Sequence, residues 1–314
     1  MLSLLGGVFM GWALGANAAA NVFGTAVSSK MLKFRTAAIL AAIFVILGAV
    51  FSGRAGIETI QNLTNFDLNQ AVISSVAAAI TVTIMTALSL PISTSQSVVG
   101  SIIGISIINR QVNFNGMGKV VACWFGTPVG CAIIAVILYK LLALIYNKFR
   151  PNMFESDSII RAGMIVAGSF GAYALGANNV ANVTAVFVGS GTLSVFNAAL
   201  IGGLSIAFGI ITNGRHLMES IGNKLVKLDP FSALVVLFAV GITIHIYSLI
   251  GVPVSSSQAI IGGLVGVGAI KGMNTIKRKM LFNILIGWFL TPVVACLFAL
   301  AIEFVVHLHY IPQH

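Results

Sequence analysis

The sequence predicts an all-α polytopic membrane protein, built from two inverted-topology repeats of about five membrane segments each, with discontinuous, proline-interrupted helices. Three observations predict this fold class. The 314-residue chain is 58% hydrophobic and only 8% charged, whereas a soluble domain carries about a quarter charged residues. Apolar runs long enough to cross a bilayer follow one another along nearly the whole chain. Four motifs also recur in the same order in both halves.

The recurring motifs divide the chain into a first repeat, residues 1–150, and a second repeat, residues 151–314. The matched positions are Asn17 and Asn178, Arg54 and Arg215, Ser93 and Ser255, and Pro128 and Pro292. The predicted membrane segments of the first repeat are residues 2–28, 36–53, 70–90, 91–108 and 119–147. Those of the second are residues 162–188, 195–212, 231–250, 252–270 and 281–306. An odd number of crossings per repeat would invert the second repeat relative to the first.

The positive charge of the chain fits this topology better than a nucleic-acid partner. The formal net charge is +10, but the basic residues lie in short loops between apolar segments. Five crossings per repeat, with the N-terminus outside, place most lysines and arginines on the inside, as the positive-inside rule requires. Four crossings per repeat would divide them almost evenly. We therefore expect a multi-pass protein of the cell (inner) membrane, with the lipid bilayer and not nucleic acid as its surroundings.

Two asparagines, four residues apart, lie inside an apolar segment of each repeat. They are Asn17 and Asn21 in the first repeat, and Asn178 and Asn182 in the second, where Asn179 is a further amide. An asparagine in hydrocarbon is costly unless its amide is used, and this spacing puts both side chains on one helix face. Interhelical hydrogen bonding between small-residue helices would explain one such motif. The duplicate favours a paired ligand site.

A proline followed by hydroxyl residues interrupts one apolar run in each repeat. Pro91 and Pro253 begin these two segments, and the side chains that follow are Ser93, Thr94, Ser95, Gln96, Ser255, Ser256, Ser257 and Gln258. Proline suits the first turn of a new helix, and a hydroxyl-rich first turn offers O–H and free N–H groups at the positive end of the helix dipole. The pattern is consistent with ordinary helix capping, but two copies beside two asparagine motifs favour an anion site.

The few charges inside or beside the membrane segments are candidates for coupling or gating. Arg54 with Glu58, and Arg215 with Glu219, are matched i,i+4 pairs, and His245 lies within an apolar segment. The simpler interpretations are helix-end ion pairs and a hydrogen-bonded core histidine. The three cysteines show no metal-ligand spacing, so no metal site and no cofactor are expected.

The paired Gly-Ala-Asn strings and the paired hydroxyl segments resemble the signatures of the inorganic phosphate transporter (PiT) family, over essentially the whole chain. The resemblance implies that the amides and hydroxyls of both motifs line an anion site. The chain departs from the family pattern at Ala18 and Asn179, where the signatures have aspartate, and at Gln96 and Gln258, where the hydroxyl segments end in histidine. These departures resemble the sulfate-permease branch of the family.

The missing carboxylates favour sulfate over phosphate. Phosphate still carries a proton near neutral pH and can donate it to a carboxylate, whereas sulfate would face that carboxylate acceptor to acceptor. A neutral pocket of Asn, Gln, Ser and Thr can instead donate hydrogen bonds to a dianion. The loss of the aspartates also weakens a sodium site, so a co-transported proton is expected and sodium is less so.

We therefore expect a secondary active transporter that imports a tetrahedral oxyanion, sulfate by proton symport, through alternating access. The alternatives are a sodium- or proton-coupled phosphate transporter and, in another class, a passive anion channel. An enzyme is not expected, because the sequence has no metalloprotease or nucleophile-elbow motif. A homodimer is expected from the family resemblance alone.

Overall fold

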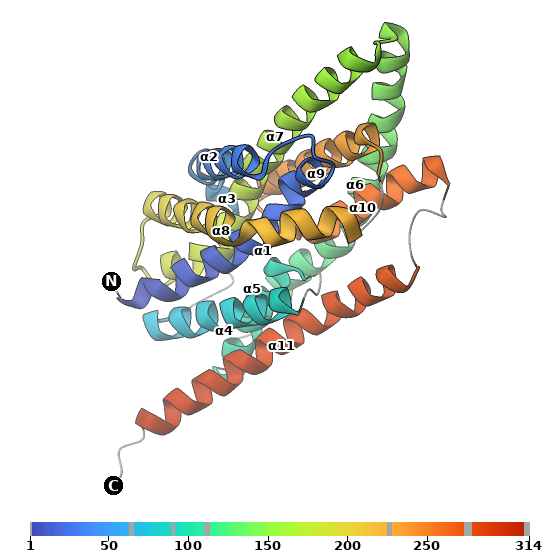
Figure 1. The fold of residues 1–314 in the computed structure, drawn as a ribbon. Helices are drawn as coiled ribbons and strands as arrows, with labels where there is room; N and C mark the ends of the chain where they lie inside the picture. The colour runs from blue at the N-terminus through green and yellow to red at the C-terminus, as the bar shows by residue number, and fades with distance from the viewer. Residues whose placement is uncertain are drawn as a thin grey trace.

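The computed structural model describes residues 2–62, 66–88, 92–109, 114–224, 228–272 and 278–310. Within these ranges the chain forms helices and no strands (Figure 1). The first half contains η1 (Leu2–Leu4), α1 (Leu5–Ser28), α2 (Phe34–Ser52), α3 (Arg54–Gln61), α4 (Leu68–Ala87), α5 (Thr94–Ile108) and α6 (Phe114–Phe149). The second contains α7 (Met153–Gly189), α8 (Val195–Lys224), α9 (Pro230–Ile250), α10 (Ser256–Lys271) and α11 (Arg278–Tyr310). The all-helical prediction is confirmed.

The two halves have the same order of helices. Helix α1 matches the asparagine-bearing part of α7, α2 with α3 matches the continuous α8, and α4, α5 and α6 match α9, α10 and α11. The predicted boundary between residues 150 and 151 falls in the connection between α6 and α7. The division into two repeats and their inversion across a bilayer stay predictions.

Seven helices in the described part of the chain are long and apolar enough to cross a membrane. These spans are Phe34–Ser52, Leu68–Ala87, Gly118–Phe149, Met153–Gly189, Val195–Glu219, Pro230–Ile250 and Leu285–His307. Of the ten predicted segments, those in α1, α5 and α10 are therefore not full spans by this measure. The amides of Asn17 and Asn21 lower the hydropathy of α1, and the 15 and 16 residues of α5 and α10 reach only about 22–24 Å of a ~30 Å hydrocarbon core.

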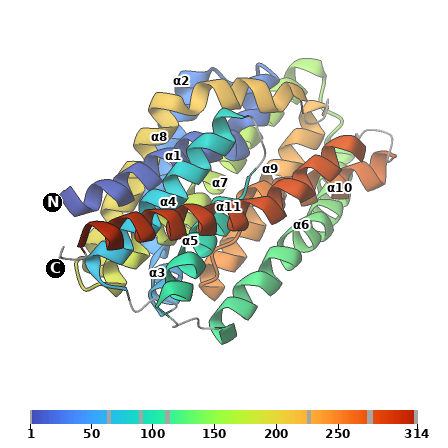
Figure 2. The same cartoon turned by 90° about the horizontal axis from the view of Figure 1, so that it is seen from below.

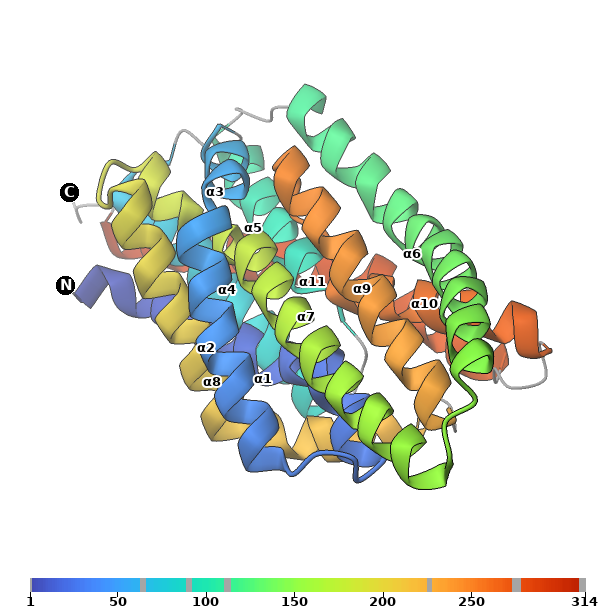
Figure 3. The same cartoon turned by 90° about the horizontal axis from the view of Figure 1, so that it is seen from above.

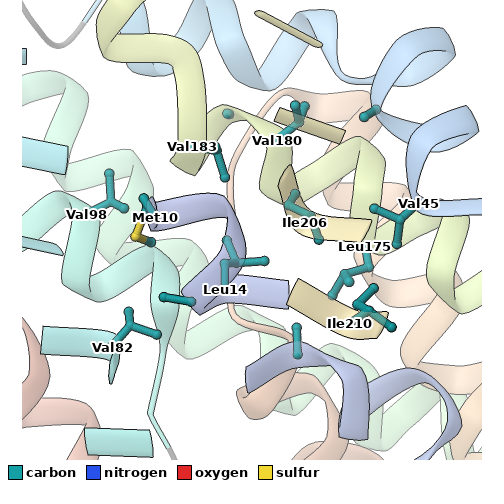
Figure 4. Packing of buried hydrophobic residues seen from close by; sticks show 14 of the residues in the cluster. Met10, Leu14, Val45, Val82, Val98, Leu175, Val180, Val183, Ile206 and Ile210 are labelled. Atoms are coloured by element: carbon teal, nitrogen blue, oxygen red, sulfur yellow. The ribbon is translucent and has the colours of Figure 1, made fainter. Parts of the chain in front are cut away.

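The asparagine helices pack against the other half of the chain. Helix α1 lies along α8, and α7 lies along α2. At both seams a glycine faces a backbone carbonyl: a Cβ on Gly15 would lie 2.0 Å from the Ile206 oxygen, and one on Gly176 would lie 2.0 Å from the Val45 oxygen. Because no side chain fits there, the backbones meet directly. Figure 4 shows buried side chains of α1, α2, α7 and α8 gathered around these crossings.

The short helices α5 and α10 are held in the same reciprocal way. Helix α5 packs on α11 and α10 packs on α6, and Figures 2 and 3 show α11 crossing α5 on one side of the molecule and α6 lying beside α10 and α9 on another. A Cβ on Gly100 would lie 2.3 Å from the Pro292 oxygen, and one on Gly262 would lie 2.1 Å from the Pro128 oxygen. Each half therefore braces the short helix of the other.

An ion pair holds the beginning of α9 to the end of α10. The Asp229 carboxylate caps α9 by accepting hydrogen bonds from the backbone N–H of Ser232 at 3.0 Å and from its hydroxyl at 2.7 Å, and it also pairs with Lys271. Partial burial acts to raise the pKa of Asp229, but the hydrogen bonds from Lys271 and Ser232 outweigh it and hold the pKa below its ordinary value. This contact closes the α9–α10 hairpin at the end opposite the hydroxyl turn of α10.

We predict that Gly262→Ala destabilises the protein, by about 1–3 kcal/mol, because the new methyl group would overlap the Pro128 carbonyl. Gly130→Ala is the control in helix α6, since a Cβ there meets nothing within 4 Å, and it should be neutral or stabilising by up to about 1 kcal/mol. Unfolding by a denaturing detergent measures both. Equal losses of stability in the two variants would contradict a direct backbone contact at Gly262.

Candidate functional site

The two asparagine motifs and the two hydroxyl turns meet inside the protein. The asparagines lie in the middle of α1 and α7, and the hydroxyl residues cap or begin α5 and α10. All of these side chains are buried except that of Ser257, which is half-buried. The predicted site residues in these motifs and turns are Asn17, Asn21, Asn178, Asn179, Asn182, Ser93, Thr94, Ser95, Gln96, Ser255, Ser256, Ser257 and Gln258. We call this set the Asn–Ser cluster.

The second asparagine of each motif donates to the hydroxyl turn of the other repeat. Asn21 Nδ2 in α1 lies 2.8 Å from Ser256 Oγ and 3.3 Å from Ser257 Oγ, at the start of α10. Asn182 Nδ2 in α7 lies 2.9 Å from Ser95 Oγ, at the start of α5. These crossed hydrogen bonds tie each asparagine helix of one half to the short helix of the other half.

Asn178 holds the extended chain that leads into α10. Its Nδ2 donates to the Val252 carbonyl at 3.0 Å and its Oδ1 accepts from the Val254 N–H at 2.9 Å. Ser95 Oγ donates to the Val254 carbonyl at 3.0 Å, so α5 fixes the same segment. Gly251, with φ +76°, ends α9 in the left-handed conformation and lets the chain turn into this extended stretch.

The matching amide of the first repeat is bonded differently. Asn17 Nδ2 donates to Thr86 Oγ1 near the end of α4, at 2.9 Å, and makes no bond like that of Asn178 to extended backbone among the described residues. Pro91, which is predicted to begin the matching segment, lies outside the described residues, whereas Pro253 lies in the extended chain before α10. The two halves of the cluster therefore differ in how tightly they hold their asparagine.

The hydroxyl turns are helix caps as well as cluster residues. Ser93 Oγ accepts from the Gln96 N–H, and Ser255 Oγ accepts from the Gln258 N–H, both at 3.2 Å. The capping interpretation is therefore correct for these two serines, while Ser95, Ser256 and Ser257 are left to contact the asparagines. The helix dipoles of α5 and α10 place the positive ends of both helices at the cluster.

Three buried amide oxygens of the cluster have no hydrogen-bond partner within the described structure. They are Gln96 Oε1, Gln258 Oε1 and Asn182 Oδ1. Unused polar atoms at a buried site are costly in a folded protein and indicate that something else meets them. A glutamine amide that turns over presents its NH2 group in the same place, so Gln96 and Gln258 can serve as donors or as acceptors. The NH2 group of Asn182 is instead held by Ser95 and Asn179. The hydroxyls of Ser256 and Ser257, which accept from Asn21, are further groups that can donate to a bound anion.

The candidate coupling pairs are exposed ion pairs in α3 and α8. Arg54 Nε bonds Glu58 at 2.6 Å, and Arg215 Nε bonds Glu219 at 2.9 Å, with the arginine side chains 80% and 72% exposed. The hydrogen bond that Arg54 donates to Glu58, followed by the negative charge of Glu58, raises the pKa of Arg54 above its ordinary value. Exposed i,i+4 pairs contribute little to stability, so the geometry matches the helix-end interpretation.

His245, in α9, lies beside two aromatic rings of α7. Its ring centroid is 5.5 Å from that of Phe170 and 5.9 Å from that of Tyr173, and its buried Nδ1 has no hydrogen-bond partner in the described structure. No described contact joins it to the Asn–Ser cluster. The histidine is therefore a half-buried side chain that packs against the α7 helix, which carries Asn178.

Sequence reasoning missed the partners that satisfy the first asparagine of each motif. Thr86 binds Asn17 through its side chain, while Val252 and Val254 bind Asn178 through backbone atoms. Thr86 and Ser248 are matched hydroxyls near the ends of α4 and α9, and that repetition is a signal that could have found Thr86. The backbone contacts carry no side-chain signal. Sequence reasoning also missed the burial of Glu303, which is 7% exposed and lies within α11.

A sequence profile of the phosphate transporter family matches residues 14–299, which include every member of the Asn–Ser cluster. The chain belongs to the phosphate transporter family. Its membership confirms the resemblance inferred from the two motifs and makes the protein a multi-pass membrane protein of a transporter family.

Two relatives in this family illustrate its range. A protein of Methanocaldococcus jannaschii, whose name marks it as a candidate phosphate permease, is 29% identical over 302 residues, covering 96% of both chains. The sulfate permease CysP of Bacillus subtilis is 27% identical over 298 residues, covering 93% of this chain and 84% of its own. A solved structure of a sodium-dependent phosphate transporter matches with a TM-score of 0.87 over 98% of both chains, at 22% identity, which supports the fold.

In this phosphate transporter family member we predict that the crossed bond between Asn182 and Ser95 couples the two repeats energetically. The variants Asn182→Ala and Ser95→Ala, alone and together, should give a coupling free energy of about 0.5–1.5 kcal/mol in detergent unfolding. Ser74→Ala combined with Asn182→Ala is the control, because Ser74 bonds Ser101 and not the cluster. Additive effects for Asn182 and Ser95 would mean that their bond does not join the repeats.

Proposed function

We propose that this protein is a secondary active transporter that imports sulfate together with protons by alternating access, and that the Asn–Ser cluster binds the anion. One observation carries the proposal: the cluster is buried, rich in donors and free of carboxylates. The chain has seven acidic residues, and each lies in another place: Glu58 and Glu219 in ion pairs, Asp67, Glu155 and Asp229 at helix starts, Asp157 in the first turns of α7, and Glu303 in α11.

The absence of these carboxylates favours an anion without a proton. The positions that carry aspartate in the family signature are Ala18 and Asn179, both fully buried. Asn179 Oδ1 accepts from Asn182 Nδ2 at 3.1 Å, so the amide takes part in the cluster without adding negative charge. A dianion bound there would meet neutral donors and two helix N-termini. It would not meet a carboxylate, which repels a dianion and to which only an anion that still carries a proton, such as phosphate, can donate a hydrogen bond.

Alternating access is supported by the reciprocal packing of the two halves. Along the α1–α8 seam the contacts run from Gly15 with Ile206 to Gly24 with Met218, so the two helices point the same way. The α2–α7 seam runs likewise, from Gly48 with Tyr173 to Gly53 with Val180. A short connection joins α1 to α2, which runs in the opposite direction. Since α7 runs in the same direction as α2, α1 and α7 point in opposite directions. That relationship is the one expected of inverted repeats.

Coupling to cations follows from the charge of the proposed substrate, and protons are the cations that we propose. The membrane potential opposes entry of an anion by about 2.3 kcal/mol per charge per 100 mV, so a dianion requires co-transported cations. Two protons give a neutral cycle and three give net positive charge movement. The proposed proton carriers are Glu58, Glu219 and His245. We also propose that the protein lies in the cell (inner) membrane. Its proposed homodimeric state rests on the family resemblance.

Phosphate uptake is the second candidate function. The name of the Methanocaldococcus jannaschii relative and the solved phosphate transporter both favour it. The unpartnered oxygens of Gln96, Gln258 and Asn182 could also ligate a sodium ion. A passive anion channel with the same lining is the alternative of another class, and it would equilibrate the anion without accumulating it.

We predict that purified protein in proteoliposomes accumulates radiolabelled sulfate above equilibrium under an inward proton gradient. A protonophore should abolish the accumulation, and a tenfold excess of phosphate should change it by less than twofold. Liposomes without protein are the control. Uptake that requires sodium, or that phosphate displaces, would establish the phosphate alternative, and equilibration without accumulation would establish a channel.

We further predict that restoring both carboxylates, as Ala18→Asp with Asn179→Asp, shifts the ratio of sulfate to phosphate uptake toward phosphate by at least tenfold. The new carboxylates would repel sulfate and accept the phosphate proton. Ala18→Asn is the matched control, because it adds an amide of similar size without charge. An unchanged ratio in the double variant would disprove the role given to the missing carboxylates.

A further inference from the structure

A pocket of about 170 Å³ lies beside Asn17, between α1, α4 and α8. Its polar lining comes from Trp12 of α1, Thr83 and Thr86 of α4, and Asn213 and His216 of α8. Because one water molecule occupies about 30 Å³ in the liquid, the pocket has room for several waters, or for a tetrahedral oxyanion in their place. None of the residues that line it is acidic.

The pocket reaches the Asn–Ser cluster through one side chain. Thr86 lines the pocket and accepts the hydrogen bond of Asn17 at 2.9 Å. The Asn213 and His216 side chains on its other wall are exposed. A polar path therefore leads from the surface of α8, through the pocket, to the first asparagine of the cluster.

The matched positions of the other repeat are filled. Tyr173, His245, Ser248 and Ser52 take the places of Trp12, Thr83, Thr86 and Asn213. Tyr173 OH and Ser52 Oγ are hydrogen-bonded at 2.6 Å, and the His245 ring packs against Tyr173. Ser248 is 2% exposed and donates to the His245 carbonyl at 2.7 Å. Bulky rings thus occupy the space that the first repeat leaves open.

The first repeat lacks this seal because its side chains differ. Thr83, at the place of His245, donates back to the Ala79 carbonyl at 2.8 Å and stays close to α4. The Trp12 indole N–H bonds Thr212 at 3.0 Å, along α8 and not across the pocket. The two routes toward the cluster are therefore unequal in this structure: the pocket reaches Thr86, the partner of Asn17, whereas the matching Ser248 lies beside the packed rings of His245 and Tyr173.

We propose that the pocket is a vestibule in which the Thr86 hydroxyl, the Asn213 amide and the His216 imidazole donate to the oxyanion next to the cluster, while Tyr173 and His245 close the matching route. The proposal deepens the proposed function and rests on it for the identity of the ligand. Hydroxyl, amide and imidazole donors suit a fully ionised oxyanion for the same reason as those of the cluster.

Cysteine labelling tests the vestibule at matched positions. In a background with Cys123, Cys131 and Cys296 changed to Ala, Thr86→Cys and Ser248→Cys are each treated in detergent with a small water-soluble maleimide. We expect Thr86→Cys to react at least tenfold faster than Ser248→Cys. Asn213→Cys is a second pocket position that leaves the bond to Asn17 intact, and it should react as fast as Thr86→Cys. Equal rates at Thr86→Cys and Ser248→Cys would overturn the unequal routes.

Ligand protection tests what the vestibule holds. Sulfate, the probe used, should slow labelling at Asn213→Cys at least threefold, while chloride at the same ionic strength should not. Labelling that neither sulfate nor phosphate slows would overturn the vestibule as an anion site, whatever the uptake experiment shows. Protection by phosphate alone would keep the vestibule and overturn sulfate as the substrate.

The closed route has its own test. Tyr173→Phe removes only the hydroxyl that bonds Ser52, and it should raise the labelling rate of Ser248→Cys at least threefold. Trp12→Phe, at the matched position, is the control and should leave that rate unchanged. An unchanged rate in Tyr173→Phe, with Tyr173→Ala equally inert, would overturn the role of Tyr173 in closing the route.

Discussion

The need to satisfy five buried asparagine amides constrains the rest of the structure. An unpaired amide in a membrane interior is costly, so each must find a partner inside the protein. The partners lie on the opposite half of the chain for Asn21 and Asn182, and on the same half for Asn17 and Asn178. The helix starts of α5 and α10 are thereby fixed at the centre, and the glycine seams that let the backbones approach serve that arrangement.

The reciprocal packing makes the two halves depend on each other. Helix α5 rests on α11 and α10 rests on α6, while α1 and α7 are each set along a helix of the other half. Neither half on its own would cover its short helix or satisfy its second asparagine. The hydrophobic cluster accordingly draws on both halves around α1, α7 and α8.

Much of this arrangement could be predicted from sequence, because it follows from duplication. The matched spacing of Asn17 with Asn178, and of Ser93 with Ser255, predicted both the helix order and the membership of the cluster. Spacing could not predict which partner each amide would choose. Asn178 binds backbone atoms of Val252 and Val254, and contacts to backbone atoms cannot be predicted from residue type. The difference from Asn17, which binds the Thr86 side chain, depends on how the chain packs after α4 and α9.

The lengths of α5 and α10 have an electrical consequence. Helices of 15 and 16 residues cannot reach from one face of a bilayer to the other, so their positive ends stand part-way through the electric field of the membrane. At the proposed anion site, an anion bound at those ends would have crossed part of that field before any helix moves. The occupancy of that proposed site, and not only the rate of the proposed cycle, would then depend on voltage.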